Sequence, residues 1–122
     1  MTKRVLFVVF GWSVNIVTLP ANRSIPEHWH RIKKELYIGV SGLGKLKIGG
    51  RTTLFGYASI HYIPAETPHS LTTETGVKFL TIESPTGPDD TVFTKDGRYP
   101  PHSPRNPASG RRGFLFSPLD PK

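Results

Sequence analysis

The hydrophobic positions of this chain alternate with polar positions over several short stretches. From residue 12 to residue 18, and again from 45 to 48, apolar side chains recur at every second position. Successive side chains of a β-strand point to opposite faces, so this period predicts strands with one buried and one solvated face. No segment between Val5 and Ser84 shows the period of a helix. Short runs rich in β-branched and aromatic residues predict further strands over 5–10, 24–30, 35–41, 51–55, 59–63, 70–75 and 77–83.

Turn-forming residues separate these predicted strands. Pro20-Ala21-Asn22 ends one of them, and Gly49-Gly50 can supply the positive φ angles of a tight hairpin between two others. Eight or nine short strands at regular spacing predict an all-β fold, either a barrel or a jelly roll. With 122 residues the chain is long enough for a single domain.

The composition changes after Ser84. Residues 85–122 contain eight of the twelve prolines and four of the twelve glycines. The proline cluster over 99–107 cannot occupy a central strand, because each proline removes a backbone donor. We therefore predict a barrel domain over 1–84 and a basic, extended or partly disordered tail over 85–122. Within the tail, Phe114-Leu115-Phe116 is apolar enough to dock on the barrel or on a partner subunit.

Charge and composition exclude several classes of function. The net charge is +7, but the basic residues are scattered and do not interleave with aromatic ones, so we expect a solvated surface and not a nucleic-acid site. The absence of cysteine excludes disulfides, thiolate nucleophiles and cysteine-ligated metals. The apolar run Val5–Phe10 is too short to cross a bilayer, and no small-residue cleavage site of a signal peptide follows it. We therefore predict that this run forms a buried strand. We also expect a cytoplasmic protein that does not bind membranes.

Three histidines and a glutamate form the clearest chemical pattern. His28 and His30 are two residues apart, and on a strand this spacing directs both imidazoles to the same face. Glu35 follows a short basic turn and can return its carboxylate to the same place. The proline-rich loop over 64–68 restricts the backbone before a further histidine, His69. These residues can therefore converge on one metal ion.

The segments that carry these residues resemble the two motifs of the cupin superfamily. The first family motif is Gly, five residues, His-any-His, three or four residues, Glu, six residues, Gly. The chain matches it from residue 22 to Gly42, except that Asn22 replaces the leading glycine. The second motif is Gly, five residues, Pro-any-Gly, two residues, His, three residues, Asn. Here Pro64 and His69 match it, whereas Ala58, Glu66 and Thr73 replace the two glycines and the asparagine.

The resemblance implies a cupin-type β-barrel, also called a double-stranded β-helix, over about residues 14–84. Fifteen residues separate Gly42 from Ala58, which is similar to the shortest spacer in the family. All four ligand positions match, so the resemblance implies one divalent transition metal per chain, held by His28, His30, Glu35 and His69. The substituted glycines put the turn geometry in doubt, not the metal.

Other residues near these motifs have more open interpretations. A single histidine on a strand is more often a structural residue than a ligand, and we expect this for His61 and His102, which match no ligand position. Tyr37 shares strand parity with Glu35, so it either orients a ligand near the metal or packs in the core. Gly39, on the same face, is expected to leave room for a small molecule. Trp29 is expected to face away from the metal, in the core or in a subunit contact.

The resemblance by itself does not choose a reaction, because cupins include dioxygenases, isomerases, decarboxylases, lyases, storage proteins and ligand-binding regulatory domains. The complete ligand set favours a metal-dependent enzyme acting on a small organic molecule, with an oxygenase as the first expectation and an isomerase or lyase next. The alternative is a non-catalytic binding or sensing module with a structural metal. The ion is Fe, Mn, Ni, Co, Cu or Zn. Because sheet edges need cover, we also expect a homodimer.

Overall fold

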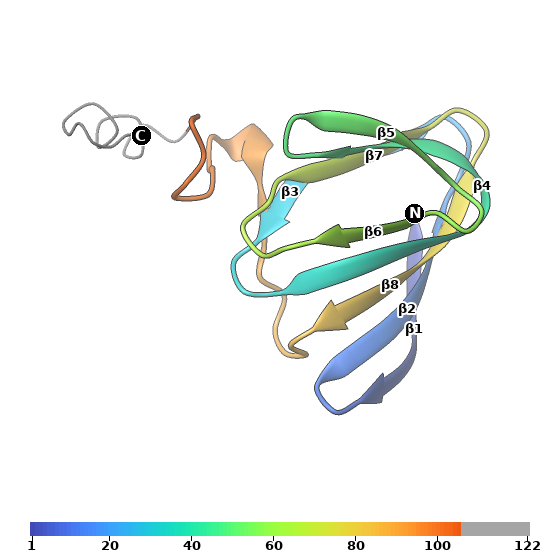
Figure 1. Cartoon of the computed structure of the whole chain (residues 1–122), viewed down its shortest axis with the longest axis horizontal. Coiled ribbons are helices and arrows are strands. Elements are labelled where there is room, and N and C mark those ends of the chain that lie inside the picture. Colours follow the sequence, from blue (N-terminus) through green and yellow to red (C-terminus); the bar gives the residue numbers. More distant parts are fainter. Residues whose placement is uncertain (106–122) are drawn as a thin grey trace.

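The computed structural model describes residues 1–105 and consists almost entirely of antiparallel strands (Figure 1). No helix among these residues is long and apolar enough to cross a membrane. The strands are β1 (Thr2–Val9), β2 (Trp12–Leu19), β3 (Arg23–His30), β4 (Lys34–Ile48), β5 (Arg51–Gly56), β6 (Ile60–Ile63), β7 (His69–Thr73), β8 (Val77–Ser84) and β9 (Thr91–Phe93), followed by the 3-10 helix η1 (Thr94–Asp96).

Strand β4 connects the two halves of the barrel. The sheet order is β1-β2-β8-β4-β7-β3-β9, and β5 and β6 pair with β4 outside this path. The first half of β4 pairs with β6 and β8, and its second half pairs with β5 and β7. The sequence predicted separate strands over 35–41 and 45–48, but the structure joins them into one strand of 15 residues. At the junction, Gly42 adopts a φ of +81°, and a Cβ there would lie 2.2 Å from the carbonyl oxygen of Gly76.

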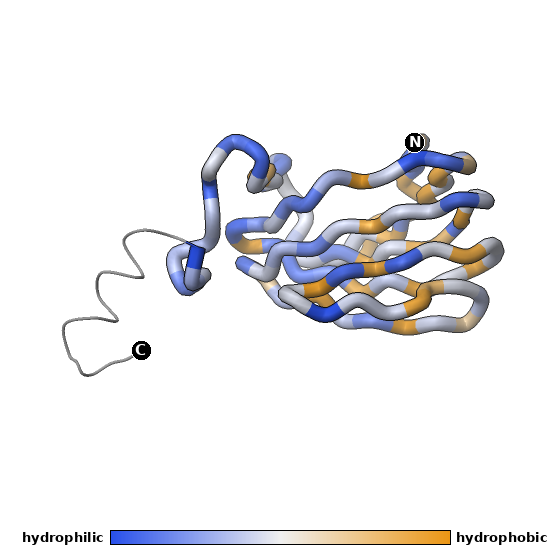
Figure 2. The backbone as a smooth tube through the Cα atoms, turned by 90° about the horizontal axis from the view of Figure 1, so that it is seen from above, coloured by the Kyte–Doolittle hydropathy of each residue, from blue (hydrophilic) through white to orange (hydrophobic). Residues whose placement is uncertain are grey.

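The inward-facing side chains change from apolar to polar along the barrel. On β8, Val77 and Phe79 face inward and belong to the hydrophobic core, whereas Thr81 and Glu83 follow on the same face. On β2, Leu19 and Val17 likewise precede the buried Asn15 on the way to the same end. Figure 2 shows hydrophobic positions interspersed with hydrophilic ones along the strands. The apolar end packs the fold, and the polar end leaves room for a site.

The sheet continues past Ser84, where the composition changes. Strand β9 pairs with β3, and the segment that contains it crosses one end of the barrel, orange in Figure 1. Residues 91–93 contain no proline, so they can join a sheet although prolines lie on both sides of them in the sequence. Trp29 is buried beneath this segment, as expected for a packing residue, and its Nε1 donates a hydrogen bond to the carbonyl oxygen of Arg98 at 3.0 Å. Phe114-Leu115-Phe116 lies outside the described residues.

Three positions where the family motifs have glycine retain the glycine-like backbone without it. Asn22, Ala58 and Glu66 adopt φ angles of 60°, 65° and 61°. The turns that the substitutions put in doubt are therefore formed with the left-handed conformation. This conformation brings the Cβ atom of an L-residue close to the backbone and costs about 1–2 kcal/mol, except that asparagine tolerates it better.

Ala58→Gly is expected to raise the free energy of unfolding by about 1 kcal/mol, because glycine adopts this φ without the steric penalty. Urea denaturation monitored by fluorescence measures the change in the free energy of unfolding. Ala21→Gly is the matched control: Ala21 also lies in an exposed turn but has no positive φ, so its substitution should be neutral or destabilising. An Ala58→Gly variant no more stable than the wild type would contradict the assigned strain.

Candidate metal centre

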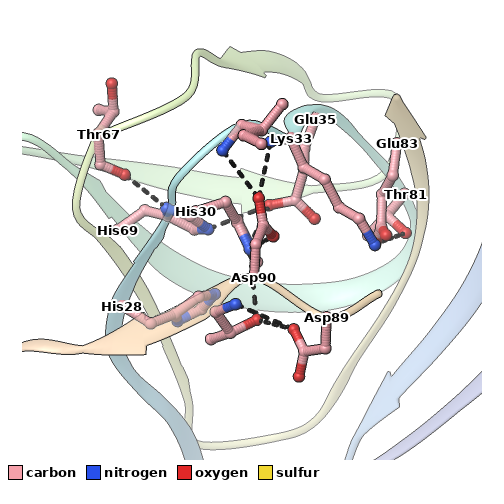
Figure 3. A network of polar contacts seen from close by, with 12 residues as sticks. His28, His30, Lys33, Glu35, Thr67, His69, Thr81, Glu83, Asp89 and Asp90 are labelled. Atoms are coloured by element: carbon pink, nitrogen blue, oxygen red, sulfur yellow. Dashed lines mark hydrogen bonds and ion pairs between the residues drawn. The ribbon is translucent and has the colours of Figure 1, made fainter. Parts of the chain in front are cut away.

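Three strand ends place the predicted ligands together (Figure 3). His28 and His30 lie at the end of β3, Glu35 near the start of β4, and His69 at the start of β7. The pairing of β3 with β7 sets His28 directly opposite His69 across the ladder, after a shift in register. All four side chains offer ligand atoms that lie within 4.8 Å of one another. The structure therefore brings together the four residues that the motifs predicted.

The ligand atoms form a buried cluster whose polar atoms lack hydrogen bonds. The Nε2 atoms of His30 and His69 lie 3.1 and 3.2 Å from Oε1 of Glu35. Despite these short distances, all three atoms are buried without a hydrogen bond of acceptable geometry to any described residue. Buried polar groups are almost always hydrogen-bonded, and leaving one unpaired costs about 1–3 kcal/mol. Three such atoms in one buried cluster could be satisfied by a bound cation.

The other nitrogen of each ring fixes the direction of the imidazole. Nδ1 of His28 lies 2.8 Å from the carbonyl oxygen of Pro26, and Nδ1 of His69 lies 2.8 Å from that of Thr67. A carbonyl oxygen can only accept, so both Nδ1 atoms carry hydrogen. In the neutral rings each Nε2 therefore has a free lone pair directed into the cluster. This donor set of three imidazole nitrogens and a carboxylate fits a divalent transition metal.

The electrostatics of the metal-free cluster favour a neutral ring at His28 and an ionised carboxylate at Glu35. Burial and the neighbouring His69 lower the pKa of His28 to about 4, which keeps its ring neutral. Burial also acts to lower the pKa of His30, but the carboxylates of Glu35 and Asp90 raise it above its usual value. Burial alone would raise the pKa of Glu35, but contacts with His30 and His69 hold it well below its usual range. The carboxylate thus stays ionised and attracts positive charge to the centre.

Asp90 orients His30 from the segment that follows β8. Its Oδ1 lies 3.1 Å from Nδ1 of His30, and its Oδ2 accepts hydrogen bonds from the backbone N–H groups of Ile32 and Lys33 at 2.8 and 2.9 Å. The carboxylate therefore fixes both the ring and the turn between β3 and β4. Sequence analysis missed this residue, because the composition assigned it to the tail and it lies 60 residues from its partner.

The cluster opens into a cavity of about 190 Å³. Tyr37 lines this cavity, and its buried ring packs against Phe79 and His69, with centroids 4.9 and 5.9 Å apart. Both readings of Tyr37, as a packing residue and as a group near the ligand, are compatible with this position. Sequence analysis missed further polar residues of the wall, which are Lys3, Thr81, Glu83, Asp89 and Thr91. The sequence could have indicated Glu83, because it follows Val77, Phe79 and Thr81 at every second position of one strand and therefore faces inward with them.

Gly39 does not leave space for a ligand, contrary to the expectation. A Cβ at this position would lie 1.7 Å from the carbonyl oxygen of Gly56. The neighbouring backbone fills the space, with hydrogen bonds from Gly39 to Ser59 and from Ala58 to Gly39 at 2.8 and 3.0 Å. Glycine is required here because two chain segments approach closely, and strand parity alone cannot show this.

The two remaining histidines lie outside the cluster, as expected. The ring of His61 contacts that of Phe55, with centroids 5.9 Å apart. His102 is mostly exposed, and its Nε2 lies 3.6 Å from Oε1 of Glu66. Neither residue belongs to a potential metal-binding group among residues 1–105.

Asp90→Asn is expected to weaken metal binding by about 10–100-fold. The substitution replaces one of the two carboxylate oxygens by an NH2 group, which cannot accept a hydrogen bond from His30 or from the backbone. Competition with a chromophoric chelator measures the dissociation constant. Asp96→Asn serves as the control, since Asp96 is exposed on η1 and does not contact the cluster. Equal metal affinities in the two variants would show that Asp90 does not support His30.

Similar proteins agree with the fold. No curated protein matches the sequence significantly. Among solved structures, TT1209 from Thermus thermophilus is similar with a TM-score of 0.64 and 20% identity, over 70% of this chain and 83% of that chain. KdgF from Halomonas sp. has a TM-score of 0.65 and 14% identity, over 70% and 78% of the two chains. The DMSP lyase DddQ from Ruegeria pomeroyi has a TM-score of 0.69 and 20% identity, over 76% and 51%.

The identities to these structures are low, so the likeness shows the fold. The sequence itself matches the family model Cupin_2, described as a cupin domain, over residues 15–83, which is more than half of the chain. This range contains both motifs and all four residues of the cluster. The chain therefore belongs to the Cupin_2 family of cupin domains.

Proposed function

We propose that this cupin is a metal-dependent enzyme that acts on a small organic molecule in the cavity beside the cluster. The observation that carries the proposal is the convergence of three buried, unpaired ligand atoms from His30, Glu35 and His69. An open wall next to the cluster gives a small molecule access to it, and the volume of about 190 Å³ limits its size.

The ligand set leaves room for chemistry at the metal. Three neutral imidazoles and one carboxylate give a divalent ion a net charge of +1 and occupy four of its six octahedral positions. Fe, Mn, Ni, Co, Cu and Zn all accept such ligands. When bound, a redox-active ion of this series supplies adjacent sites for a substrate and for dioxygen, so oxidation of the substrate by dioxygen is the first reaction to test. Tyr37, on the cavity wall, would orient the substrate through its hydroxyl group.

A lyase or isomerase reaction is the second candidate. The structurally similar protein from Ruegeria pomeroyi is a DMSP lyase, and this likeness in fold makes a lyase reaction worth testing here. The cavity also contains a carboxylate that is not part of the metal cluster, on Glu83. A non-catalytic module that binds a small ligand at a structural metal is the alternative to both reactions.

His69→Ala is expected to abolish metal binding, because it removes one of four ligands and leaves Glu35 without one of its two buried contacts. Elemental analysis of untagged protein should find about one transition metal per wild-type chain and little in the variant. His61→Ala is the matched control, since His61 lies outside the cluster, and it should keep the metal.

Turnover then separates an enzyme from a binding module. The metal-loaded wild type should consume dioxygen or convert a substrate, and the His69→Ala variant should not. A protein that only gains thermal stability from a ligand, without consuming it, would support the binding module. Wild-type protein that holds no metal even after reconstitution would overturn the enzyme proposal.

We also propose that the chain forms a homodimer through β1. This strand lies at one edge of the sheet, and its apolar side chains are exposed on both faces from Val5 to Val9, as is Phe10 after it. The sequence predicted a buried strand here, so within the described chain this prediction is not met. Pairing with β1 of a second copy about a two-fold axis would satisfy the edge backbone groups and place apolar faces together.

The double substitution Phe7→Lys and Val9→Lys is expected to convert the dimer to a monomer, because it places charges along one face of the edge strand. Sedimentation velocity measures the mass. Tyr57→Lys removes an exposed aromatic side chain away from β1 and should leave the dimer intact. A wild type that is monomeric at micromolar concentrations would contradict the proposed pairing.

A further inference from the structure

A second polar group faces the cavity on the wall beside the metal centre. Lys3, Thr81 and Glu83 line the same cavity as His28, His30 and Glu35. Thr81 and Glu83 lie on β8, and Lys3 reaches the cavity from β1. Figure 3 shows Glu83 and Thr81 next to Glu35, on the side away from His28 and His69. None of these three residues belongs to the four-residue metal cluster.

Hydrogen bonds hold the carboxylate of Glu83 in a fixed position. Nζ of Lys3 donates to Oε2 of Glu83 at 2.7 Å, and the hydroxyl of Thr81 donates to the same oxygen at 3.1 Å. Nδ2 of Asn15 donates to Oγ1 of Thr81 at 3.1 Å and so orients that hydroxyl. No residue in 1–105 forms a hydrogen bond with Oε1 of Glu83. One oxygen is therefore anchored, and the other retains its capacity to accept.

The location of this network is costly for the fold. Glu83 is 6% exposed, and the preceding inward positions on β8 are apolar core residues. Burying a carboxylate and its partners costs more than an apolar side chain of the same size would, even when the charge is paired. A core built for stability alone would continue with apolar residues here. The network is therefore better explained by a ligand in the cavity than by packing.

The register places Glu83 within reach of a molecule at the metal centre. Glu83 is the direct cross-strand partner of Glu35 on the pairing of β8 with β4, and both side chains are buried on the inner face. Side chains of directly opposed residues are separated by about 5 Å at their Cβ atoms. A small molecule that faces the cluster with one group can therefore contact Glu83 with the next.

We propose that Glu83 is the proton acceptor and donor of this cavity, and that its substrates are small oxygen-bearing molecules with an acidic O–H or C–H bond beside the atoms that face the metal. This inference rests on the proposed metal-dependent function and adds to it a reaction class, proton transfer. Oε1 of Glu83 takes the proton, and the electron pair of the broken bond stays on the substrate. Protonated Glu83 then returns the proton to the same atom or a neighbouring one, so no oxidant is consumed.

Lys3 and Thr81 act as positioning residues in this scheme. Their two hydrogen bonds to Oε2 hold the carboxylate in the cavity wall and leave Oε1 to accept a proton, and the ammonium group of Lys3 balances the negative charge of the carboxylate. Neither residue has to contact the substrate. This arrangement supplies the proton transfer that the second candidate, a lyase or isomerase reaction, would use.

The test measures where a ligand's proton goes. Acetohydroxamic acid is a small probe that gives up its hydroxyl proton when it binds a divalent ion. Calorimetric titration of the zinc-loaded full chain, in two buffers of different ionisation enthalpy, counts the protons released to solvent. With Glu83 as acceptor, the wild type should release about none and Glu83→Gln about one proton per bound probe. Glutamine keeps the shape of the side chain, and its amide oxygen still accepts from Lys3 and Thr81.

Two further variants control the measurement. Glu74→Gln changes an exposed glutamate in the turn between β7 and β8, and it should behave as the wild type does. Glu83→Asp keeps a carboxylate and should again release fewer protons than Glu83→Gln, which a merely structural role would not produce. The zinc content of every sample is measured alongside.

The outcomes separate this inference from the proposed function. Equal proton release by the wild type and Glu83→Gln, with zinc bound to both, would overturn the role of Glu83 and leave the metal centre standing. A zinc-loaded wild type that does not bind the probe would overturn it as well. Wild-type protein without zinc would contradict the metal-dependent function on which the inference depends.

Discussion

The ladder between β3 and β7 is the constraint on which the site depends. It sets His28 opposite His69, and the backbone carbonyls of Pro26 and Thr67 then hold both rings by Nδ1. Because side chains alternate along a strand, a shift of one residue in this register would turn the ligands to the outer face. The backbone itself therefore sets the directions of these two rings, and the candidate metal cluster is as rigid as the sheet that carries it.

The rest of the barrel offsets the free-energy cost of burying the polar atoms of this cluster. Three imidazoles and a carboxylate share a buried space in which their unpaired atoms face one another. The opposite end of the barrel is filled by large apolar side chains, among them Phe55, Leu19 and Leu46, which are almost fully buried. Burial of such side chains contributes about 1.5–3 kcal/mol each. Burial at the apolar end thus offsets the cost of the buried polar groups at the other end.

The segment after β8 contributes more to the site than its composition indicates. Strand β9 and Asp90 close one side of β3, and Asp89 and Thr91 line the cavity. The metal centre and the docking of this segment are consequently linked through His30. A cupin barrel that ended at Ser84 would keep the four ligands but would lose the carboxylate that orients one of them.

The chain's sequence by itself determined the fold class, most strand positions and the four residues of the candidate metal cluster. The strands follow from local rules, since alternation and turn residues act within a few residues of one another, and the cluster residues follow from the two family motifs. The same rules could not show that residues 35–48 form one bent strand, because bending at Gly42 depends on the approach of Gly76. They also could not place Asp90 beside His30 or Lys3 beside Glu83, pairs that are 60 and 80 residues apart. Only the closed barrel brings such residues together, because contacts across a sheet are set by the pairing of distant strands and not by sequence neighbours.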